Sequence, residues 1–372
     1  MTAKGAPTSQ IPELKIRAVE TTGVMVPLRY SLGTSAAVIS EAPLLLVDLT
    51  TDAGITGRAY IFCFQPSGAP AIAAIVREAV GLVAGRPVAP VAVSTFLNRR
   101  YALFGVTGAV RMALSLLDMA LWDALAQALG QPLATVLGGE AQPIRAYNSC
   151  GLGLMGAEKT AAEALKLLEG GFTGVKLRLG YPTLEEDVAV TRAVRKAVPA
   201  HVVVPADYNQ ALTVTEAIRR GRALQGEGIY WLEEPIRHDD YRGNAAIAAA
   251  LEVPLQLGEN LNGPEAMAEA LAAGACDYVM PDVCRIGGVT GWMQSAGVAA
   301  AQGVAMSSHL MPEVSVHLLG ATPTRHWLEY MDWADAVLVE PLKVRDGFAH
   351  PLPGPGIGLA WDRGKIARLK SL

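Results

Sequence analysis

Three acidic residues recur at an even spacing in the second half of the chain. Asp207, Glu233 and Glu259 are separated by 26 residues in each case, and each follows a short apolar run. Neighbouring strands of one sheet would bring the three carboxylates to one mouth, where converging anions need a cation. Oxygen donors suit Mg²⁺ better than zinc, which prefers His and Cys. One such acid would more simply cap the following helix, but three at this repeat predict a Mg²⁺ site.

A histidine and an aspartate follow two later apolar runs in the same way. Asp282 comes after the sixth run of the second half and His309 after the seventh, so adjacent strands would place the two side chains together. An aspartate that accepts from one ring nitrogen fixes the histidine tautomer and raises the basicity of the other nitrogen. A lone histidine is more often structural, but this paired placement predicts that His309 is a general base supported by Asp282.

Two cations and a further acid complete the charged set. Lys176 and Arg178 alternate on the second run, so both side chains point to the same side of a strand. Two cations beside a metal site suit an anionic substrate, although either could pair with the metal-site acids instead. Glu329 ends the last apolar run. In so acidic a site it is predicted to hold a proton and to donate a hydrogen bond to a developing enediolate.

The elements that must position these residues follow from the pattern after Pro143. Short apolar runs alternate with helical stretches of about 10 to 15 residues. Eight such units predict an α/β barrel, a modified (β/α)8 TIM barrel, with its active site at the carboxyl ends of the strands. The predicted strands are Ile144–Asn148, Thr173–Leu177, Val202–Ala206, Ile229–Leu232, Leu255–Leu257, Tyr278–Met280, Val304–Met306 and Trp327–Glu329.

The first part of the chain has a different pattern. Three apolar runs separated by turn residues predict a three-stranded antiparallel sheet, and from there to Gly130 the period becomes helical. This combination predicts an α+β N-terminal capping domain. The runs are Lys15–Met25, Pro43–Leu49 and Ile55–Phe62. The expected divisions of the chain are a cap over residues 1–140, a barrel over 141–330 and a C-terminal segment, 331–372, that returns to the cap.

Composition narrows the class of protein. Hydrophobic residues make up 51% of the chain and charged residues 18%, which is enough apolar area for a large buried core. A net charge of −4 without a basic run predicts no nucleic-acid partner and no membrane partner. Four cysteines without CxxC spacing fit a reducing cytoplasm, as does a polar N-terminus without an apolar signal region.

The order of the charged motifs resembles mandelate racemase and its family within the enolase superfamily. The likeness runs from about residue 15 to the C-terminus. The matching motifs are Lys176-Leu-Arg178, Asp207-Tyr-Asn209, Glu233-Glu-Pro235, Gly258-Glu259-Asn260, Pro281-Asp282, Ser307-Ser-His309 and Trp327-Leu-Glu329.

The resemblance implies a role for each matching residue. Mg²⁺ would be held by the three recurring acids, and His309 with Asp282 would be the base for one face of the α-carbon. Lys176, Glu329 and Ser149 would hold the substrate carboxylate. Asn209 would lie near the α-hydroxyl. The resemblance also implies assembly as a homo-oligomer, often an octamer.

The family's aryl pocket is also recognisable in this chain. Ordinary packing between cap and barrel would use the same residue types, yet a sugar-acid site would want hydroxyl partners that these positions hardly offer. The resemblance therefore implies a small-molecule substrate that is an aryl or bulky apolar 2-hydroxy acid. The implied pocket residues are Leu32, Ala36, Ile39, Phe62, Phe64, Leu103, Leu310 and Met331.

One departure from the family pattern matters more than the matches. Racemases of this family have a lysine at the position of Arg178, and that lysine is the second base. At pH 7 an arginine must bridge a pKa gap of about 5.5 units, or on the order of 7.5 kcal/mol, whereas the gap for a lysine is about 3.4 units. Arg178 is therefore predicted to be a poor base.

Three functions stay open at this point. The first is a racemase of an aryl or apolar 2-hydroxy acid, in which Arg178 is an inefficient base. The second is a one-base acid-sugar dehydratase, in which His309 takes the α-proton and helps a β-hydroxyl to depart. The third is a carboxylate-binding homologue without turnover, against which the intact pair of His309 and Asp282 speaks.

Overall fold

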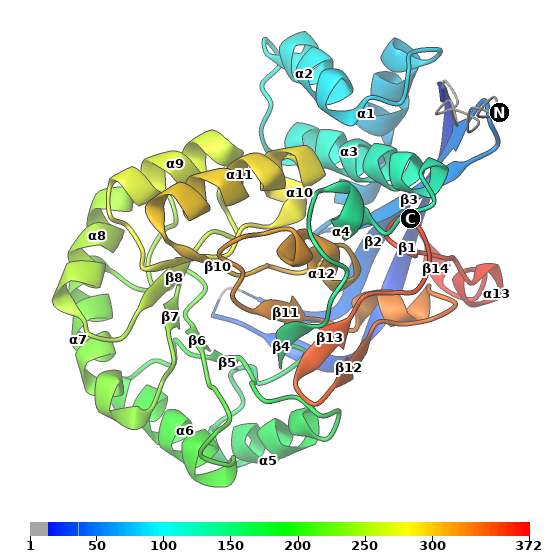
Figure 1. Cartoon of the computed structure of the whole chain (residues 1–372). Coiled ribbons are helices and arrows are strands. Elements are labelled where there is room, and N and C mark those ends of the chain that lie inside the picture. Colours follow the sequence, from blue (N-terminus) through cyan, green and yellow to red (C-terminus); the bar gives the residue numbers. More distant parts are fainter. Residues whose placement is uncertain (1–13, 36) are drawn as a thin grey trace, which may run out of the picture.

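The first part of the chain forms an antiparallel sheet in a computed structural model that describes residues 14–35 and 37–372 (Figure 1). The strand order is β14-β1-β2-β3, so the three predicted strands are joined at the edge by a fourth strand from the C-terminus. The first strand is longer than predicted, because its pairing resumes after a register shift between Pro27 and Leu32. The strands are β1 (Ile16–Gly33), β2 (Val38–Thr51), β3 (Thr56–Phe62) and β14 (Lys370–Ser371).

Helices cover the inner face of this sheet and join it to the barrel. The longest, α3, is buried along most of its length. Asp118 on α3 accepts hydrogen bonds from the backbone N–H and the hydroxyl of Thr290, at 2.9 and 2.6 Å, and so caps a barrel helix. The cap helices are α1 (Gly68–Val83), α2 (Pro90–Tyr101), α3 (Gly108–Ala128) and α4 (Leu133–Val136).

Eight parallel strands form a closed barrel beside this cap. Strands β5 to β10 make one six-stranded sheet, and β11 pairs with β4. Isolated bridges between Asn148 and Val175 and between Met306 and Arg325 close the ring. The strands are β4 (Ile144–Asn148), β5 (Leu177–Arg178), β6 (Ala206–Asp207), β7 (Leu232–Glu233), β8 (Leu255–Leu257), β9 (Tyr278–Val279), β10 (Ala305–Met306) and β11 (Leu328–Tyr330).

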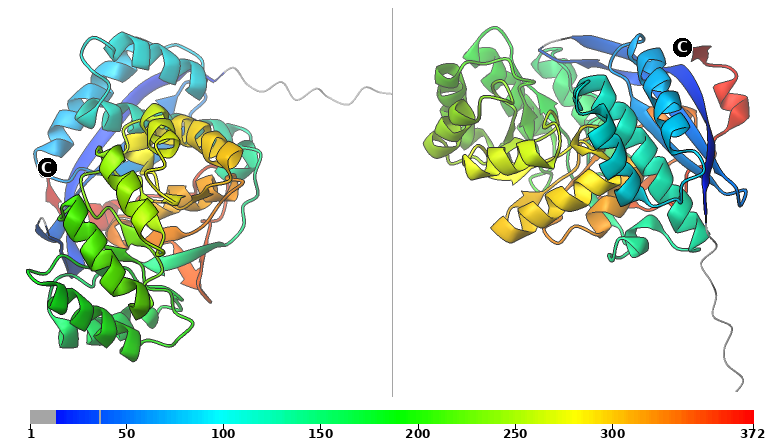
Figure 2. Two further views of the ribbon diagram at one scale, coloured as in Figure 1. Left: turned by 90° about the vertical axis from the view of Figure 1, so that its left-hand side faces the viewer. Right: turned by 90° about the horizontal axis from the view of Figure 1, so that it is seen from above.

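The barrel helices surround the strands, and the cap lies against one side (Figures 1 and 2). Seven strands are followed by an α-helix, but β11 is followed only by the short helix η2 (Trp333–Ala336). The predicted modified barrel with an α+β cap is therefore confirmed. The helices are α5 (Ala157–Leu168), α6 (Leu184–Ala197), α7 (Val214–Leu224), η1 (Gln225–Glu227), α8 (Tyr241–Ala250), α9 (Pro264–Ala272), α10 (Val283–Ile286), α11 (Gly288–Gln302) and α12 (Pro312–Gly320).

Aromatic side chains fill the barrel below the charged residues. Tyr147, Trp231 and Trp327 are buried together, with ring centroids of Tyr147 and Trp231 5.6 Å apart. The indole N–H of Trp231 donates to Glu233 Oε2 at 3.2 Å. The packed interior therefore supports a metal-site carboxylate from below, because the rigid indole fixes one of its oxygens.

The C-terminal segment contacts both the barrel and the cap. Strand β13 (Phe348–His350) pairs with β12 (Lys343–Arg345) and with β4, while the chain beyond α13 (Arg363–Ile366) forms β14 on the cap sheet. Asp48 on β2 holds this end of the chain. It accepts from Arg58 at 3.0 Å and from the indole of Trp361 at 3.1 Å, and it also pairs with Arg363.

Removal of the Asp48 carboxylate should loosen this junction. Asp48→Ala leaves the buried indole N–H without an acceptor and two guanidinium groups without their anion, which costs about 2 kcal/mol. We expect a thermal unfolding midpoint lower by a few degrees, measured by differential scanning fluorimetry. Asp239→Ala, which breaks an exposed pair with Arg237, is the control and should leave the midpoint nearly unchanged. Equal midpoints for Asp48→Ala and the unmodified protein would contradict this role.

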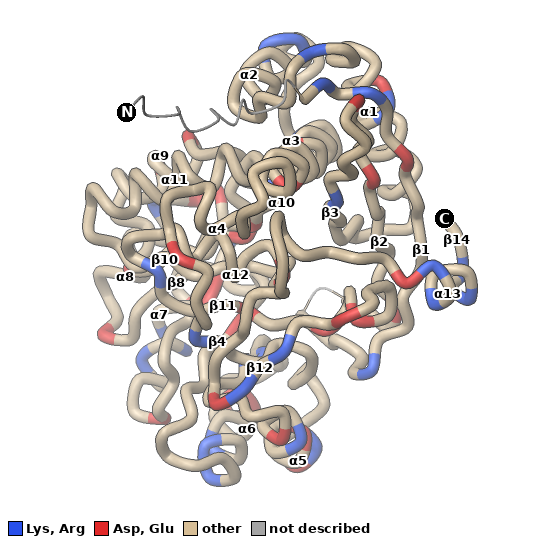
Figure 3. Tube along the Cα trace, turned by 45° about the vertical axis from the view of Figure 1, so that its right-hand side comes forward, with Lys and Arg blue, Asp and Glu red and all other residues tan. Residues whose placement is uncertain are grey.

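Charge is distributed evenly over the described part of the chain. Basic and acidic residues are interspersed along helices and strands of both parts (Figure 3), in line with a net charge of −4. Among the described residues, no helix is both long enough and apolar enough to cross a membrane.

Candidate active site

The predicted charged residues converge on one cavity at the carboxyl ends of the barrel strands, beneath the cap. Its volume is about 340 Å³. The predicted site residues that line it are Lys176, Arg178, Asp207, Asn209, Glu259, His309 and Glu329 from the barrel, with Leu32, Ile39, Phe62, Phe64, Leu310 and Met331 as apolar walls. Chain segments far apart in sequence are thus brought together as the strand-end pattern predicted.

The three recurring acids form one cluster. Asp207 and Glu233 are neighbours in the register of β6 and β7, and Glu259 follows β8 after Gly258. Each of the three offers an oxygen, and these oxygens all lie within 4.8 Å of one another. Gly258 permits this arrangement, because its φ is +148° and a Cβ there would lie 2.7 Å from the backbone nitrogen of Met280.

The cluster fits a divalent cation. Burial raises the pKa of Glu233 to about 8 although Lys176 acts to lower it, and the charges of Asp207, Glu329 and Glu259 add to the rise. Asn209 Oδ1 and Glu234 Oε1 are buried without hydrogen-bond partners. Mg²⁺ prefers oxygen donors of this kind, negatively charged carboxylates among them. Asp207, Glu233 and Glu259 would hold the ion, which would supply positive charge to a developing enediolate.

Loss of one carboxylate should therefore weaken the ion's binding. Glu259→Gln is the suitable change because Glu259 is only half-buried, so the fold should tolerate it. We expect the dissociation constant of Mg²⁺, measured by isothermal titration calorimetry, to rise on the order of 100-fold. Glu252→Gln, on an exposed turn, is the matched control. Equal Mg²⁺ affinity in both variants would rule out this site.

His309 and Asp282 form the predicted pair. His309 Nδ1 donates to Asp282 Oδ2 at 2.8 Å, and a β-bridge holds the two backbones side by side. Asp282 is itself fixed, because its other oxygen accepts from the backbone of Cys284 at 2.6 Å. The opposite ring nitrogen, Nε2, lies 3.3 Å from Glu259 Oε2. Burial lowers the pKa of His309, but Glu259, Glu329 and Asp282 outweigh it and raise the value to about 9.

Lys176 lies among the acids. Its Nζ is 2.7 Å from Glu329, 2.8 Å from Glu233 and 3.3 Å from Asp207, and the four side chains are buried. Lys176 therefore does pair with the metal-site acids, an alternative that the sequence left open. Lys176 still lines the cavity.

The prediction that Glu329 holds a proton is wrong for the described site. Burial acts to raise the pKa of Glu329, but Lys176 and His309 together lower it to about 2. Its two oxygens accept from Ser149 Oγ at 2.7 Å and from the backbone of Leu310 at 2.9 Å. The ammonium of Lys176, 2.7 Å from Glu329, is the main cause of this lowered pKa.

Arg178 is held by its surroundings. Its guanidinium donates to the carbonyl oxygens of Gly151 and Ser149 and to Ser149 Oγ, the latter two at 3.1 and 3.0 Å. These contacts fix the orientation of the guanidinium. Ser149 is wholly buried behind Glu329 and Arg178, so its implied contact with the substrate stays a prediction.

Strained backbone surrounds the site. Asn209, Gln210, Glu234, Leu310 and Met311 have φ between +35° and +65°, a left-handed conformation that costs energy in residues other than glycine. At Asn209 this conformation accompanies a contact with the metal site, because Asn209 Nδ2 donates to Asp207 Oδ2 at 3.0 Å. Asn209 is thereby placed at the cavity with its Oδ1 free of protein partners.

The apolar wall is present with one exception. Phe62 and Phe64 pack with ring centroids 4.6 Å apart, and Trp333, which was not predicted, packs against Phe62 at 4.5 Å. Leu103 does not belong to this wall. It lies fully exposed between α2 and α3, because the chain turns outward there, so that prediction is wrong. Ala36 lies outside the described residues.

Several polar residues of the cavity were missed by the sequence reasoning. The wall positions named above are apolar, but the cap loops and the strand-end loops supply five further polar residues to the cavity. Two of them, Asn260 and Arg285, follow the strands β8 and β9, and this position could have indicated that they line the cavity. The five are Thr34, Gln65, Gln210, Asn260 and Arg285.

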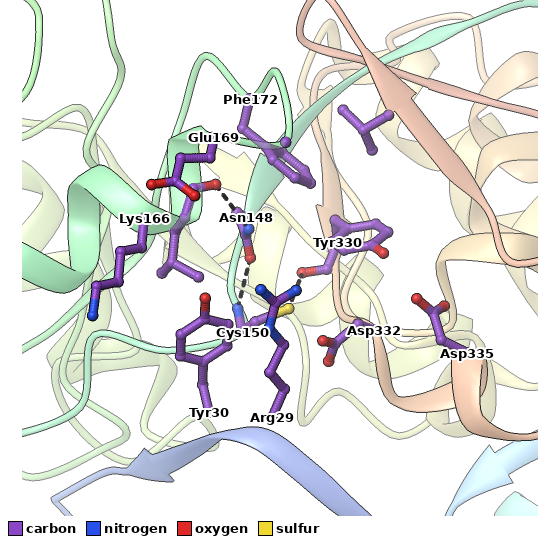
Figure 4. Close-up of a pocket in the computed structure, with 13 residues that line it drawn as sticks. Arg29, Tyr30, Asn148, Cys150, Lys166, Glu169, Phe172, Tyr330, Asp332 and Asp335 are labelled. Atoms are coloured by element: carbon purple, nitrogen blue, oxygen red, sulfur yellow. Dashed lines mark hydrogen bonds between the residues drawn. The ribbon is translucent and has the colours of Figure 1, made fainter.

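A second, polar cavity of about 230 Å³ lies on the other side of η2 (Figure 4). Met331 and Trp333 line the substrate cavity, whereas Asp332 and Asp335 line this one. Arg29 and Tyr30 reach into it from β1. The short helix η2 therefore separates the two cavities and presents its apolar side to the substrate cavity.

Comparison with known proteins gives the relationship of this chain. The N-terminal domain model of mandelate racemase/muconate lactonizing enzyme matches residues 14–138, and the enolase C-terminal domain-like model matches residues 159–365. Both parts of the fold are therefore matched over most of their length.

Individual relatives have several activities. L-talarate/galactarate dehydratase from Salmonella typhimurium is 30% identical over 311 residues, 83% of this chain and 78% of the relative. An enolase from the alpha proteobacterium BAL199, solved with bound magnesium, has a TM-score of 0.94 and 40% identity, over 96% of this chain and all of its own.

A third relative was solved with a ligand in place. An enolase from Bradyrhizobium complexed with magnesium and mandelic acid has a TM-score of 0.93 and 38% identity, over 98% of this chain and 100% of its own. Both structures hold magnesium, and the curated relatives include dehydratases, cycloisomerases and an epimerase. The chain belongs to the mandelate racemase/muconate lactonizing enzyme family of the enolase superfamily.

Proposed function

We propose that this protein uses Mg²⁺ and a single base, His309, to remove the proton α to the carboxylate of a 2-hydroxy acid, and that a β-hydroxyl then leaves as water. The observation that carries the proposal is the contrast between two side chains of the cavity. His309 turns its Nε2 to the cavity, near Glu259, whereas Arg178 is fixed by three hydrogen bonds. This makes the protein a hydro-lyase of the family.

Each residue of the cavity has its own role in the proposed reaction. Lys176 would attract the substrate carboxylate, and an ion held by Asp207, Glu233 and Glu259 would add positive charge there. His309 Nε2 takes the α-proton, and Asp282 stabilises the imidazolium that forms. The electron pair left on the α-carbon passes into the carboxylate as an enediolate. It then expels the β-hydroxyl, which takes the proton from His309 on the same face and departs as water. The enol that remains tautomerises to a 2-keto acid.

The walls of the cavity support a substrate with both polar and apolar parts. Asn209 and Gln210 are close to the metal site, where hydroxyl groups of the substrate would lie. Leu32, Phe62 and Met331 offer apolar surface for the remainder. A 2,3-dihydroxy carboxylate with an apolar end matches both the polar and the apolar part of the cavity wall.

A direct assay of product tests this proposal. A panel of 2,3-dihydroxy acids is incubated with the protein and Mg²⁺, and 2-keto acid is trapped with semicarbazide and measured by absorbance. We expect keto acid from members with apolar ends, and none from the His309→Asn variant. If no 2-keto acid forms from any member while Mg²⁺ is bound, the hydro-lyase proposal fails.

Racemisation of an aryl 2-hydroxy acid is the second candidate. The apolar wall and the mandelic acid bound to the Bradyrhizobium relative favour it. It needs a second base on the side of Arg178, and the fixed guanidinium is the argument against it. Homo-oligomeric assembly and a cytoplasmic location stay predictions.

A further inference from the structure

A larger chamber lies directly beside the substrate cavity. Its volume is about 720 Å³, against about 340 Å³ for the substrate cavity. Four residues line both: Phe64 and Gln65 from the cap, and Asn260 and Arg285 from the barrel. The two spaces are thus separated by one layer of side chains.

Arg285 is the main part of this partition. Its guanidinium carbon lies 4.2 Å from the centre of the Phe64 ring, a cation–π contact. It also donates to Asn260 Oδ1 and, at 3.3 Å, to the backbone oxygen of Glu259. Arg285 and Phe64 are both only half-buried, and Phe64 has a φ of +61°. The partition therefore consists of side-chain contacts across a domain boundary and can shift without loss of core packing.

The chamber has the lining of a site for an apolar group. Ala71 and Ile72 of α1 and Ala109 and Met112 of α3 form its walls, and none of its described lining residues is Asp or Glu. Ligand cavities range over about 300 to 1,000 Å³, so the substrate cavity alone is at the lower end of that range. A substrate with an extended end would outgrow it on the side of Arg285.

We propose that this chamber is an extension of the substrate site, that it takes the distal apolar part of the substrate, and that Arg285 stacked on Phe64 sets the length at which a substrate must enter it. The proposal rests on the proposed function, because it assumes a 2-hydroxy carboxylate at the metal site. Arg285 is thereby a specificity-determining residue of the reaction.

A series of ligands with increasing chain length tests this proposal. Isothermal titration calorimetry measures binding to the Mg²⁺-loaded protein of 2-hydroxy acids whose phenyl ring is carried on zero, one, two or three methylene groups. Each methylene that becomes buried should tighten binding about fourfold. We expect a continued rise through the series, at least tenfold in all, in the unmodified protein.

Variants that fill the chamber provide the comparison. Ala71 and Ala109 are exposed, so the double change Ala71→Phe and Ala109→Phe fills the chamber without replacing a core residue. The rise with chain length should be lost in it. Ala246→Phe, on the exposed face of α8 and outside both cavities, is the matched control and should keep the rise.

The outcomes are separable. If the shortest acid binds but longer ones gain nothing in the unmodified protein, the extension is refuted and the proposed function stands. An equal rise in the filled variant would also refute it, because the chain would then lie elsewhere. If no acid binds while Mg²⁺ does, the proposed function fails and the extension fails with it.

Discussion

Replacement of His309 by asparagine should lower the rate of α-proton exchange on the order of 1,000-fold or more, within the usual contribution of a general base. The imidazole is the one group in the described cavity with a fixed tautomer and a ring nitrogen not engaged by its supporting carboxylate. Asparagine keeps a donor toward Asp282 but cannot accept the proton. The rate is measured by NMR as the loss of the α-proton signal of a bound 2-hydroxy acid in D₂O.

Two controls separate loss of the base from loss of the site. His201→Asn, on the exposed surface, should exchange at the rate of the unmodified protein. The Mg²⁺ affinity of His309→Asn should be unchanged, because the three carboxylates remain. Exchange that persists within tenfold of the original rate in His309→Asn would show that another group removes the proton.

Arg178→Lys should give the protein a second base. A lysine has a pKa about 2 units or more below that of an arginine, so the change should raise racemisation by 100- to 1,000-fold, roughly. The shorter side chain also gives up the fork of hydrogen bonds to Gly151 and Ser149, which frees the amine to reach the cavity. Polarimetry of each enantiomer of mandelate follows the gain.

A substitution of arginine by lysine on the surface is the control. Arg192→Lys, in an exposed pair with Glu227, should behave as the unmodified protein does. Circular dichroism establishes that Arg178→Lys folds. A folded Arg178→Lys that binds mandelate yet gains no racemisation would refute the assignment of this position.

Much of the fold followed from the sequence because the barrel is a repeat. Each strand-helix unit places its charged residue at the end of a strand. The sequence alone therefore predicts that Asp207, Glu233 and Glu259 lie at the same end of the barrel. Five of the eight barrel strands, β5, β6, β7, β10 and β11, begin later than predicted. Apolar residues such as Gly174 and Val203 upstream of β5 and β6 pair only through isolated bridges.

The features that were not predictable depend on distances across the chain. The lowered pKa of Glu329 follows from Lys176 at 2.7 Å and from His309, and strand order alone gives no such distance. Leu103 was misplaced because the turn between α2 and α3 points outward, which a resemblance cannot show. Arg285 was missed because its partner Phe64 lies in the other domain.

The central claim is that one base, His309, acts on one face of the substrate. Each enantiomer of mandelate is incubated separately with the protein and Mg²⁺ in D₂O, and exchange of the α-proton and optical rotation are followed together. We predict exchange in one enantiomer alone, without loss of rotation, because the same imidazole returns the proton to the face it left. Exchange of both enantiomers with loss of rotation would contradict the claim and establish a second base.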